Sequence, residues 1–411
     1  MTILYNFSIW FLGLFLTLAA RFSHKARLWV DGRKSWSEKL SAELRKSSSL
    51  IWFHASSLGE FEQGRPIIER VRNDYPNHQI LLTFYSPSGY EVRKDFSKAD
   101  YVCYLPLDTP GNAEKFLDIT RPKLAIFIRY EFWHNFLRAM FKRDIPVVTV
   151  SAIFRKNQIF FKPYGAWFRK TLRGISYFFA QNQVSLDLLD SIGITNTVLS
   201  GDTRLDRVWE AVQKKREFPF VKKFLAGKMC LMAGSTWPYD NKLLNGILPE
   251  FPDLKFVIVP HHVDDANIRR TMDLFGDRAV LYTQGEDQDL QEKQVLVVDT
   301  MGMLAYLYRL ADLTYIGEGF GKGIHSILEP AAFGIPVFFG PNYHKFQEAV
   351  DLVERRGVFC VKDRTQLIEV IRHFVNNEEE RQGAGRICRD YIIEKKGATE
   401  KVMEGLKEFL E

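Results

Sequence analysis

An acidic residue that could remove a proton follows a short apolar run early in the chain. The motif HASSLGE covers residues 54–60, and a helix is expected to begin within it. The dipole of a helix favours the ionised form of a carboxylate in its first turn. An ionised carboxylate at the carboxyl end of a parallel strand is placed to accept a proton from a substrate hydroxyl. Glu60 is therefore predicted to be a general base, and capping of the helix is the simpler alternative.

A second acid and a cation follow later strands of the same half. Glu131 lies in the motif RYEFW, residues 129–133, and could instead form an ordinary ion pair with Arg129. Arg204 lies in the motif SGDTRLD, residues 200–206, where its permanent charge would suit a departing phosphate. The alternative for Arg204 is a surface ion pair with Asp202 or Asp206.

Short polar motifs in the second half have the residue types of a phosphate or sugar site. In AGST, residues 233–236, small residues let backbone N–H groups approach a phosphate, and Ser235 and Thr236 are equally good helix caps. Pro260 and His261 follow the next apolar run, and DTMGML covers residues 299–304. His261 and His262 are adjacent and lack the i, i+4 spacing of zinc ligands, so we expect them to hydrogen-bond a ligand.

The densest motif is GEGFGKGIHSILEPAA, residues 317–332. Its four alternate glycines are entropically costly, and we expect them to let the backbone lie against a ligand. The spacing matches neither a Walker loop nor a Rossmann fingerprint. Glu329, next to Pro330 at a predicted helix start, is placed to accept hydrogen bonds from the vicinal hydroxyls of a ribose.

The elements that must position these motifs alternate between short apolar runs and amphipathic helical stretches, which is typical of parallel α/β structure. Strands are predicted at 50–53, 79–84, 123–128, 146–150, 176–180, 228–233, 255–259, 295–298, 313–316, 336–339 and 357–361. A polar stretch near 208–226 separates two similar halves. We expect the carboxyl ends of both sheets to surround one central cleft. The expected parts are 1–21 as a membrane anchor, 22–207 and 227–390 as domains, 208–226 as a linker, and 391–411 as a terminal helix that packs back on the first domain.

The amino terminus is long and apolar enough for a membrane helix. The first twenty residues carry no formal charge, and a span needs about 17 to 25 residues. The positive charge follows this run, unlike in a cleaved signal peptide, and can meet anionic lipid headgroups. It also places the body on the cytoplasmic side of the membrane. The alternatives are a helix lying in the membrane surface and a buried core helix. The basic residues are Arg21, Lys25, Arg27, Arg33 and Lys34.

Composition excludes several other classes of protein. The chain has 411 residues, 46% of them hydrophobic and 26% charged, which is an ordinary globular composition of two-domain length. The net charge of +6 is too small to indicate a nucleic-acid partner. The four cysteines form no CxxC pair, so neither a disulfide framework nor a zinc site is expected.

Taken in order, the apolar amino terminus, HASSLGE, AGST, DTMGML and GIHSILEPAAFGIPVFFGP resemble the Kdo transferases of lipopolysaccharide synthesis over essentially the whole chain. The resemblance implies a GT-B fold with two Rossmann-like domains, the first binding the acceptor and the second the nucleotide sugar. It also implies inverting transfer of 3-deoxy-D-manno-oct-2-ulosonic acid (Kdo) from CMP-Kdo to a lipid A precursor, at the cytoplasmic face of the inner membrane. No cofactor or metal is implied.

The resemblance also assigns roles to individual residues. Glu60 matches the general base of the family's SxGE loop, Glu131 the acid of its TELWP segment, and Arg204 the lysine of its GNLKFD segment. The implied nucleotide-sugar residues are Ser235, Thr236, Pro260, His261, Met301, Gly302, Met303, His325, Ser326, Ile327, Leu328 and Glu329. Five of the matched positions depart from the family pattern: Arg204 replaces Lys, His261 replaces Arg, Met303 replaces Glu, Ser326 replaces Asn and Ile327 replaces Pro.

Two other functions are compatible with the same motifs. One is a membrane-associated GT-B enzyme that uses a UDP-sugar, such as a lipid A disaccharide synthase or an epimerase. The other is a tethered binding protein that has lost turnover. Suitable chemistry at Glu60, Glu131 and Arg204 favours an enzyme.

Overall fold

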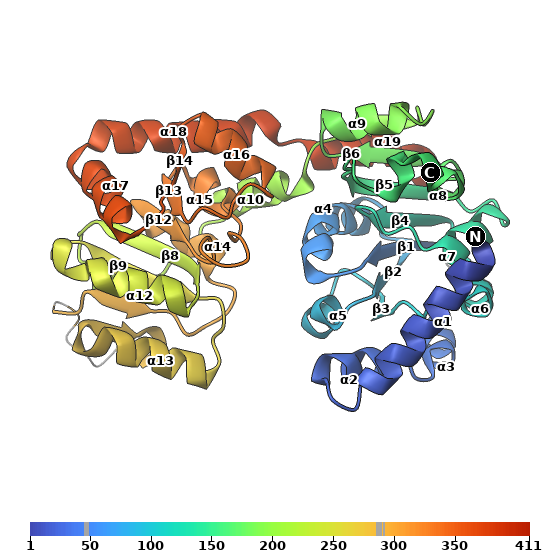
Figure 1. Ribbon diagram of the computed structural model, residues 1–411, viewed down its shortest axis with the longest axis horizontal. Helices are drawn as coiled ribbons and strands as arrows, with labels where there is room; N and C mark the ends of the chain where they lie inside the picture. The colour runs from blue at the N-terminus through green and yellow to red at the C-terminus, as the bar shows by residue number, and fades with distance from the viewer. Residues whose placement is uncertain (45–48, 285–289, 291) are drawn as a thin grey trace. The chain divides into compact units, whose positions relative to one another are not determined.

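Two parallel sheets organise the computed structural model, which describes residues 1–44, 49–284, 290 and 292–411. The chain divides into two compact units (Figure 1). The first contains Met1–Asp206 together with Gly397–Glu411, and the second contains Arg207–Lys396. The predicted fold class of two parallel α/β domains is confirmed.

The first unit is built on seven parallel strands in the order β3-β2-β1-β4-β5-β6-β7. The strand order reverses at β1: β2 and β3 are added on one side of it, and β4 and the later strands on the other. The strands are β1 (Leu50–Ala55), β2 (Gln79–Phe84), β3 (Tyr101–Tyr104), β4 (Leu124–Ile128), β5 (Val147–Ala152), β6 (Tyr177–Ala180) and β7 (Thr197–Leu199).

Helices cover both faces of this sheet. Because strand side chains alternate, Trp52 packs on one face among Phe116 and Phe136, whereas Phe53 packs on the other with Phe61 and Phe179. The helices are α1 (Thr2–Ala19), α2 (His24–Asp31), α3 (Trp36–Glu43), α4 (Leu58–Asp74), α5 (Pro87–Arg93), α6 (Pro110–Thr120), α7 (His134–Phe141), η1 (Ile159–Phe161), η2 (Pro163–Gly165), α8 (Ala166–Leu172), α9 (Gln183–Asp190), α10 (Thr203–Gln213) and α19 (Ala398–Leu410).

The second unit repeats the plan with seven parallel strands in the order β10-β11-β9-β8-β12-β13-β14. Its direction of growth reverses at β8, between β9 and β12. The strands are β8 (Cys230–Thr236), β9 (Lys255–Pro260), β10 (Ala279–Leu281), β11 (Val295–Val297), β12 (Leu313–Ile316), β13 (Val337–Phe339) and β14 (Val358–Cys360). The helices are α11 (Pro219–Leu225), α12 (Pro238–Ile247), η3 (Leu248–Glu250), α13 (Asp265–Phe275), η4 (Gly276–Arg278), η5 (Tyr282–Gln284), α14 (Leu304–Leu307), η6 (Tyr308–Leu310), α15 (Leu328–Phe333), α16 (Gln347–Glu354), α17 (Arg364–Asn376) and α18 (Glu378–Lys395).

The chain passes from the first unit to the second at residue 207 and returns to the first unit at residue 397. The stretch 208–226, expected to be a linker, contains the end of α10 and the whole of α11, and it belongs to the second unit. After α18 the chain returns to the first unit as α19. There Val402, Met403, Leu406 and Leu410 join the core that α4 covers.

The amino-terminal helix α1 lies along the first unit (Figure 1). Among the described helices, α1 alone is long and apolar enough to cross a membrane. Tyr5 donates a hydrogen bond to Asp108 (2.7 Å), and Asn135 donates one to Asn6 (2.9 Å). Only Ile9 of α1 is buried, so the opposite side of the helix presents a row of large apolar side chains. They are Ile3, Leu4, Phe7, Trp10, Phe11, Leu14, Phe15 and Leu18.

Candidate active site

Two carboxylates meet at the point where the first sheet reverses its direction of growth. Glu60 is in the first turn of α4, directly after β1, and Glu131 is in the loop after β4. Because β1 and β4 are hydrogen-bonded neighbours, their carboxyl ends place both acids at one edge of the sheet. Ligands of open parallel sheets bind at this switch point. The structure therefore brings together two of the three predicted catalytic residues.

The Glu60 side chain is held in a fixed orientation. It is only 7% exposed, and its carboxylate accepts a hydrogen bond from the backbone N–H of Ser56 at 2.5 Å. Glu60 therefore does what a capping residue does, but at a buried strand end beside a second acid. The capping alternative explains the hydrogen bond and leaves the acid pair unexplained.

The two acids perturb one another. Burial raises the pKa of Glu131 to about 8, and the negative charge of Glu60 adds to this rise. Burial also raises the pKa of Glu60, against hydrogen bonds from Ser56 and Ser57 and the positive charge of Arg129. Arg129 lowers the pKa of both acids without forming a direct ion pair with either within the described chain. Glu131 is therefore largely protonated near neutral pH, and two neighbouring acids in unequal environments form an arrangement that separates an acid role from a base role.

A buried hydrogen-bond chain supports the loop that carries Glu131. The indole N–H of Trp133 donates to Nε2 of His54 (3.1 Å), and the His54 Nδ1 lies 2.8 Å from Oγ1 of Thr83. Burial lowers the pKa of His54 to about 3, so the ring is neutral and Nδ1 carries its hydrogen. The loop is thereby fixed to the centre of the sheet. The sequence motif contains His54 and Trp133 but gives no sign that they pair.

Arg204, the third predicted catalytic residue, lies in the first turn of α10. Its guanidinium forms an ion pair with Asp202, with Nη2 and Oδ2 2.6 Å apart. The ion pair with Asp202, which was the alternative to a phosphate-binding role, is therefore present. Its neighbour Thr203 hydrogen-bonds the backbone oxygen of Gln63, one turn after Glu60. α10 therefore begins against the first turns of α4.

In the second unit, aromatic and histidine side chains gather at the carboxyl ends of β8, β9 and β12. His261 stacks on Trp237 and on His325, with ring centroids 5.3 and 4.4 Å away. The Trp237 indole donates to Nε2 of His325 (3.2 Å). Burial lowers the pKa of His261 and of His325, so both rings are neutral near pH 7. Sequence reasoning named both histidines but missed Trp237, although it directly follows the predicted AGST motif.

The buried acid Asp240 ties the glycine-rich loop to β8. Its carboxylate accepts hydrogen bonds from Tyr315 Oη (2.7 Å) and from the backbone N–H groups of Glu318 and Trp237 (both 2.9 Å). Sequence reasoning missed Asp240, although Asp three residues after the helix N-cap is a recognisable capping signal.

Two of the alternate glycines have a packing role, which corrects the expectation that all four leave the backbone free for a ligand. A Cβ atom on Gly317 would lie 2.3 Å from the carbonyl oxygen of Ser235, and one on Gly319 would lie 2.4 Å from the backbone nitrogen of Gly340. Backbone approaches backbone at both positions, so a side chain cannot be accommodated.

Glu329 lies in the first turn of α15, as expected, and is partly exposed. Ser326 Oγ donates to its carboxylate (2.5 Å), and Arg207 lies close enough for charge interaction. Some predicted nucleotide-sugar residues have buried side chains, so only their main-chain groups could face a ligand. These are Thr236, Pro260, Met303, Ile327 and Leu328, whereas Met301 is 78% exposed. Gly302 adopts a positive φ of 80° in the turn before α14.

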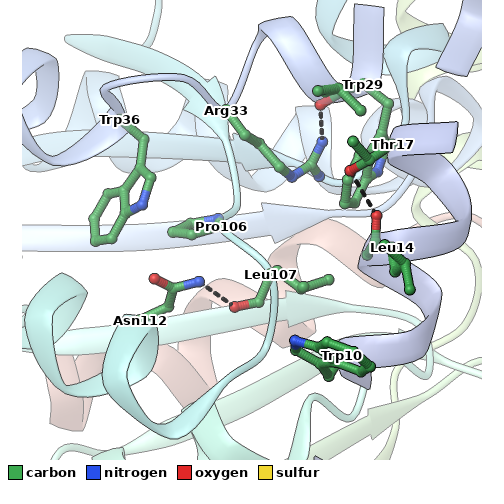
Figure 2. Close-up of a pocket in the computed structure, with 11 residues that line it drawn as sticks. Trp10, Leu14, Thr17, Trp29, Arg33, Trp36, Pro106, Leu107 and Asn112 are labelled. Atoms are coloured by element: carbon green, nitrogen blue, oxygen red, sulfur yellow. Dashed lines mark hydrogen bonds between the residues drawn. The ribbon is translucent and has the colours of Figure 1, made fainter. Parts of the chain in front are cut away.

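A cavity of about 360 Å³ lies beneath α1 in the first unit (Figure 2). Trp10, Trp29 and Trp36 line it, together with Leu14 and Arg33. Arg33 donates to the carbonyl oxygens of Leu105 and Tyr85 (both 2.8 Å) and of Trp29 (2.9 Å). The Arg33 guanidinium therefore binds backbone carbonyl groups of the protein, which corrects its assignment to a lipid-facing basic cluster. The cluster that remains exposed is Arg21, Lys25, Arg27 and Lys34.

Known proteins resemble this chain in two ways: transferases resemble it in sequence, and epimerases of solved structure resemble it in fold. Residues 34–207 match the family model "3-Deoxy-D-manno-octulosonic-acid transferase (kdotransferase)". The chain is 27% identical to the 3-deoxy-D-manno-octulosonic acid transferase of Haemophilus influenzae, over 88% of this chain and 87% of that protein. It is 26% identical to the transferase of the same name from Aquifex aeolicus, over 82% of this chain and 89% of that protein.

Among solved structures, the UDP-GlcNAc 2-epimerase of Neisseria meningitidis bound to UDP-GlcNAc is similar, with a TM-score of 0.62 and 17% identity over 88% of this chain and 100% of that chain. At this identity the likeness shows the two-domain fold alone. The transferase relatives, in contrast, match in sequence through both units. The chain is thus similar to the 3-deoxy-D-manno-octulosonic acid transferases, and these matches identify it as a glycosyltransferase.

Proposed function

We propose that this glycosyltransferase moves Kdo from CMP-Kdo to a hydroxyl of a lipid A precursor, with inversion at the anomeric carbon. The observation that carries the proposal is the placement of Glu60 and Glu131 after the neighbouring strands β1 and β4, at the switch point of the first sheet. A family of Kdo transferases needs a base for the acceptor hydroxyl, and these two acids are suited to that task.

In the proposed reaction, Glu60 takes the proton of the acceptor hydroxyl as its oxygen bonds to the anomeric carbon. The bond between that carbon and the phosphate oxygen breaks, and its electron pair leaves with CMP. Glu131, which is largely protonated near neutral pH, lies beside Glu60 without adding a second negative charge. Arg204 is proposed to stabilise the departing phosphate, for which it would exchange part of its contact with Asp202.

The nucleotide is proposed to bind the second unit at the carboxyl ends of β8, β9, β11 and β12. Ser235 begins the turn toward α12, His261 and His325 present stacked rings, and Glu329 offers a carboxylate to the ribose hydroxyls. The remaining members of the proposed set are Thr236, Pro260, Met301, Gly302, Met303, Ser326, Ile327 and Leu328. The arrangement supports stacking and hydrogen bonding, since the permanent charge of an arginine is absent at position 261.

Attachment to the cytoplasmic face of the inner membrane is proposed to occur through α1. Its inner side is hydrogen-bonded to Asp108 and Asn135, so we propose that α1 lies in the membrane surface, with its exposed apolar row in the lipid. The exposed basic residues after α1 fit anionic headgroups. A lipid acceptor would then be available where the enzyme is attached.

The test is to incubate the purified chain with CMP-Kdo and tetraacyl lipid A precursor and to weigh the products. We expect the acceptor to gain Kdo and the Glu60→Gln variant to lose about 10²–10⁴-fold in turnover, while it still binds CMP-Kdo. UDP is expected not to compete with the donor. An unchanged acceptor mass, inhibition by UDP in place of CMP, or full turnover by Glu60→Gln would each contradict the proposal.

A further inference from the structure

Arg129 is a cation in the acid-pair site whose guanidinium is not satisfied by the protein. Its backbone N–H pairs with the Val150 carbonyl (2.9 Å), so its main chain continues the sheet ladder. Its Nε is shielded from solvent and has no hydrogen-bond partner in the described part of the chain. The described contact of the guanidinium is with the ring of Tyr130, whose centroid is 5.4 Å away.

The conformation of Arg129 is costly as well. Its φ of 68° places a residue other than glycine in the left-handed region, directly after the last residue of β4. Such a conformation is unfavourable for a residue with a Cβ atom, and a shielded charged donor without an acceptor adds to that cost. Residues that hold such a conformation are concentrated at functional sites. The two unfavourable features together indicate a group that is completed by a ligand.

The charges around Arg129 limit what that ligand can be. Glu60 and Glu131 lie close enough to interact electrostatically, and the positive charge of Arg129 favours the ionised form of each. A substrate that brings a further anion into this site would be repelled by the pair unless the anion met a cation. A guanidinium offers several N–H donors in the geometry that a carboxylate requires.

The sugar transferred in the proposed function supplies such an anion. A 2-ulosonic acid carries its carboxylate directly on the anomeric carbon, one bond from the atom that the acceptor oxygen attacks. If Glu60 serves that attack, the carboxylate must lie within the same small site as Arg129. A phosphate on the acceptor is separated from the attacking hydroxyl by several bonds and is less constrained to this position.

We propose that Arg129 binds the carboxylate of the transferred sugar acid, satisfying its unpartnered guanidinium N–H groups and holding that carboxylate away from Glu60. The inference rests on the proposed function. It assigns to the first unit a specificity for acidic sugars, and it gives a role to a residue that sequence reasoning considered only as an ion-pair partner of Glu131.

The experiment compares Arg129→Gln and Arg129→Lys with wild type and with Arg121→Gln. Arg121 is a matched control because it also has a positive φ, of 40°, but it is exposed at the end of α6. Affinities for CMP-Kdo and for CMP are measured by calorimetry, and KM is measured for donor and acceptor separately. The folded fraction of each variant is checked by circular dichroism.

We expect Arg129→Gln to weaken CMP-Kdo binding about tenfold or more, with CMP binding and the acceptor KM unchanged. Arg129→Lys should recover part of the loss, since it restores charge without the planar fork. Removing the cation should also raise the apparent pKa values of the acid pair in the pH profile, an effect that a purely structural role would not produce.

The inference is overturned if wild type transfers Kdo but Arg129→Gln binds CMP-Kdo as wild type does. It is equally overturned if only the acceptor KM rises, because the anion would then be an acceptor phosphate. Failure of wild type to bind CMP-Kdo would instead defeat the proposed donor, and with it this inference. The two failures are therefore distinguishable.

Discussion

At the scale of single residues, burial of the acid pair lowers the free energy of unfolding when Glu131 is ionised. Glu131 has a pKa of about 8 in the folded protein against 4.5 for the ordinary side chain. Between these pH values the folded state binds a proton that the unfolded state has lost. The free energy of unfolding therefore falls as pH rises through this window. Strongly perturbed acids in a polar loop are typical of active sites.

Replacing Glu131 by glutamine should remove this pH dependence, because the amide does not titrate. We expect thermal unfolding to show Glu131→Gln gaining stability over wild type as the pH is raised from about 5 to about 8. Glu404→Gln, at an exposed position on α19, serves as the control. Equal melting temperatures of wild type and Glu131→Gln across that range would show that Glu131 is not perturbed.

Turnover should depend on pH in a related way. Protonation of Glu60 removes the base at low pH, and loss of the Glu131 proton above about pH 8 leaves two negative charges that repel an acidic sugar. We therefore expect a bell-shaped profile of kcat/KM, with the alkaline fall expressed mainly in the KM for the donor. Glu131→Gln should flatten the alkaline limb. An unchanged alkaline limb in that variant would assign it to another group.

Candidate site residues could be predicted from the sequence only where a short motif near a strand end contains them. Glu60 and Glu131 were named because each acid follows an apolar run, and parallel strands bring such positions to one edge. The state of Arg129 could not be read, since neither its left-handed backbone nor the lack of an acceptor for its Nε leaves a sequence signal. The His54 and Trp133 hydrogen bond joins loops far apart in the chain and was hidden for the same reason.

At the scale of elements, the three strands that the pattern missed lie at sheet edges: β3, β7 and β10. β3 and β7 are short and largely only partly buried, unlike the central parallel strands, which are buried along their whole length. The predicted strands all occur, and their ends agree with the structure to within three residues. The terminal helix expected at 391–411 occurs as α19, which begins later, at Ala398, because α18 extends to Lys395.

The position of α1 gives an element-scale prediction. Tyr5 donates to Asp108, a buried acid that also accepts from the backbone N–H groups of Asn135 and Phe136. Loss of the tyrosine hydroxyl costs about 1 kcal/mol. In Tyr5→Phe we therefore expect amide hydrogen exchange in residues 2–19 to be about fivefold faster, in detergent or in lipid nanodiscs.

Tyr164→Phe is the matched control, because Tyr164 is 73% exposed. A helix that crosses the bilayer alone would have no contact with Asp108. Exchange in α1 that is insensitive to Tyr5→Phe in nanodiscs would therefore contradict the proposed surface position.

At the scale of the whole molecule, the carboxyl terminus is structurally part of the first unit. Asp206 accepts hydrogen bonds from Thr399, through its N–H and its hydroxyl (both 2.7 Å), which fixes the start of α19. Its end is fixed by Lys123, which donates to the Leu410 carbonyl (2.9 Å). Between these points, Leu406 is fully buried.

Leu406→Ala should destabilise the first unit by about 2–4 kcal/mol, because it removes buried methyl groups and leaves a cavity. Lys407→Ala, on the exposed side of the same helix, should have little effect. Hydrogen exchange resolved by peptide should show the loss in β1, β2 and α4, with the core of residues 207–396 unchanged. Equal destabilisation of both units would indicate that they unfold together.

The return of α19 also affects the order of events during synthesis. Leu406 and Leu410 complete an apolar surface formed by α4 and its strands, yet they are translated only after the whole of residues 207–396. At roughly 5–20 residues per second, the nascent first unit waits on the order of tens of seconds with that surface open to water. A ribosome that stalls late in the message would thus release a product whose earliest portion is the part left unfinished and prone to aggregate.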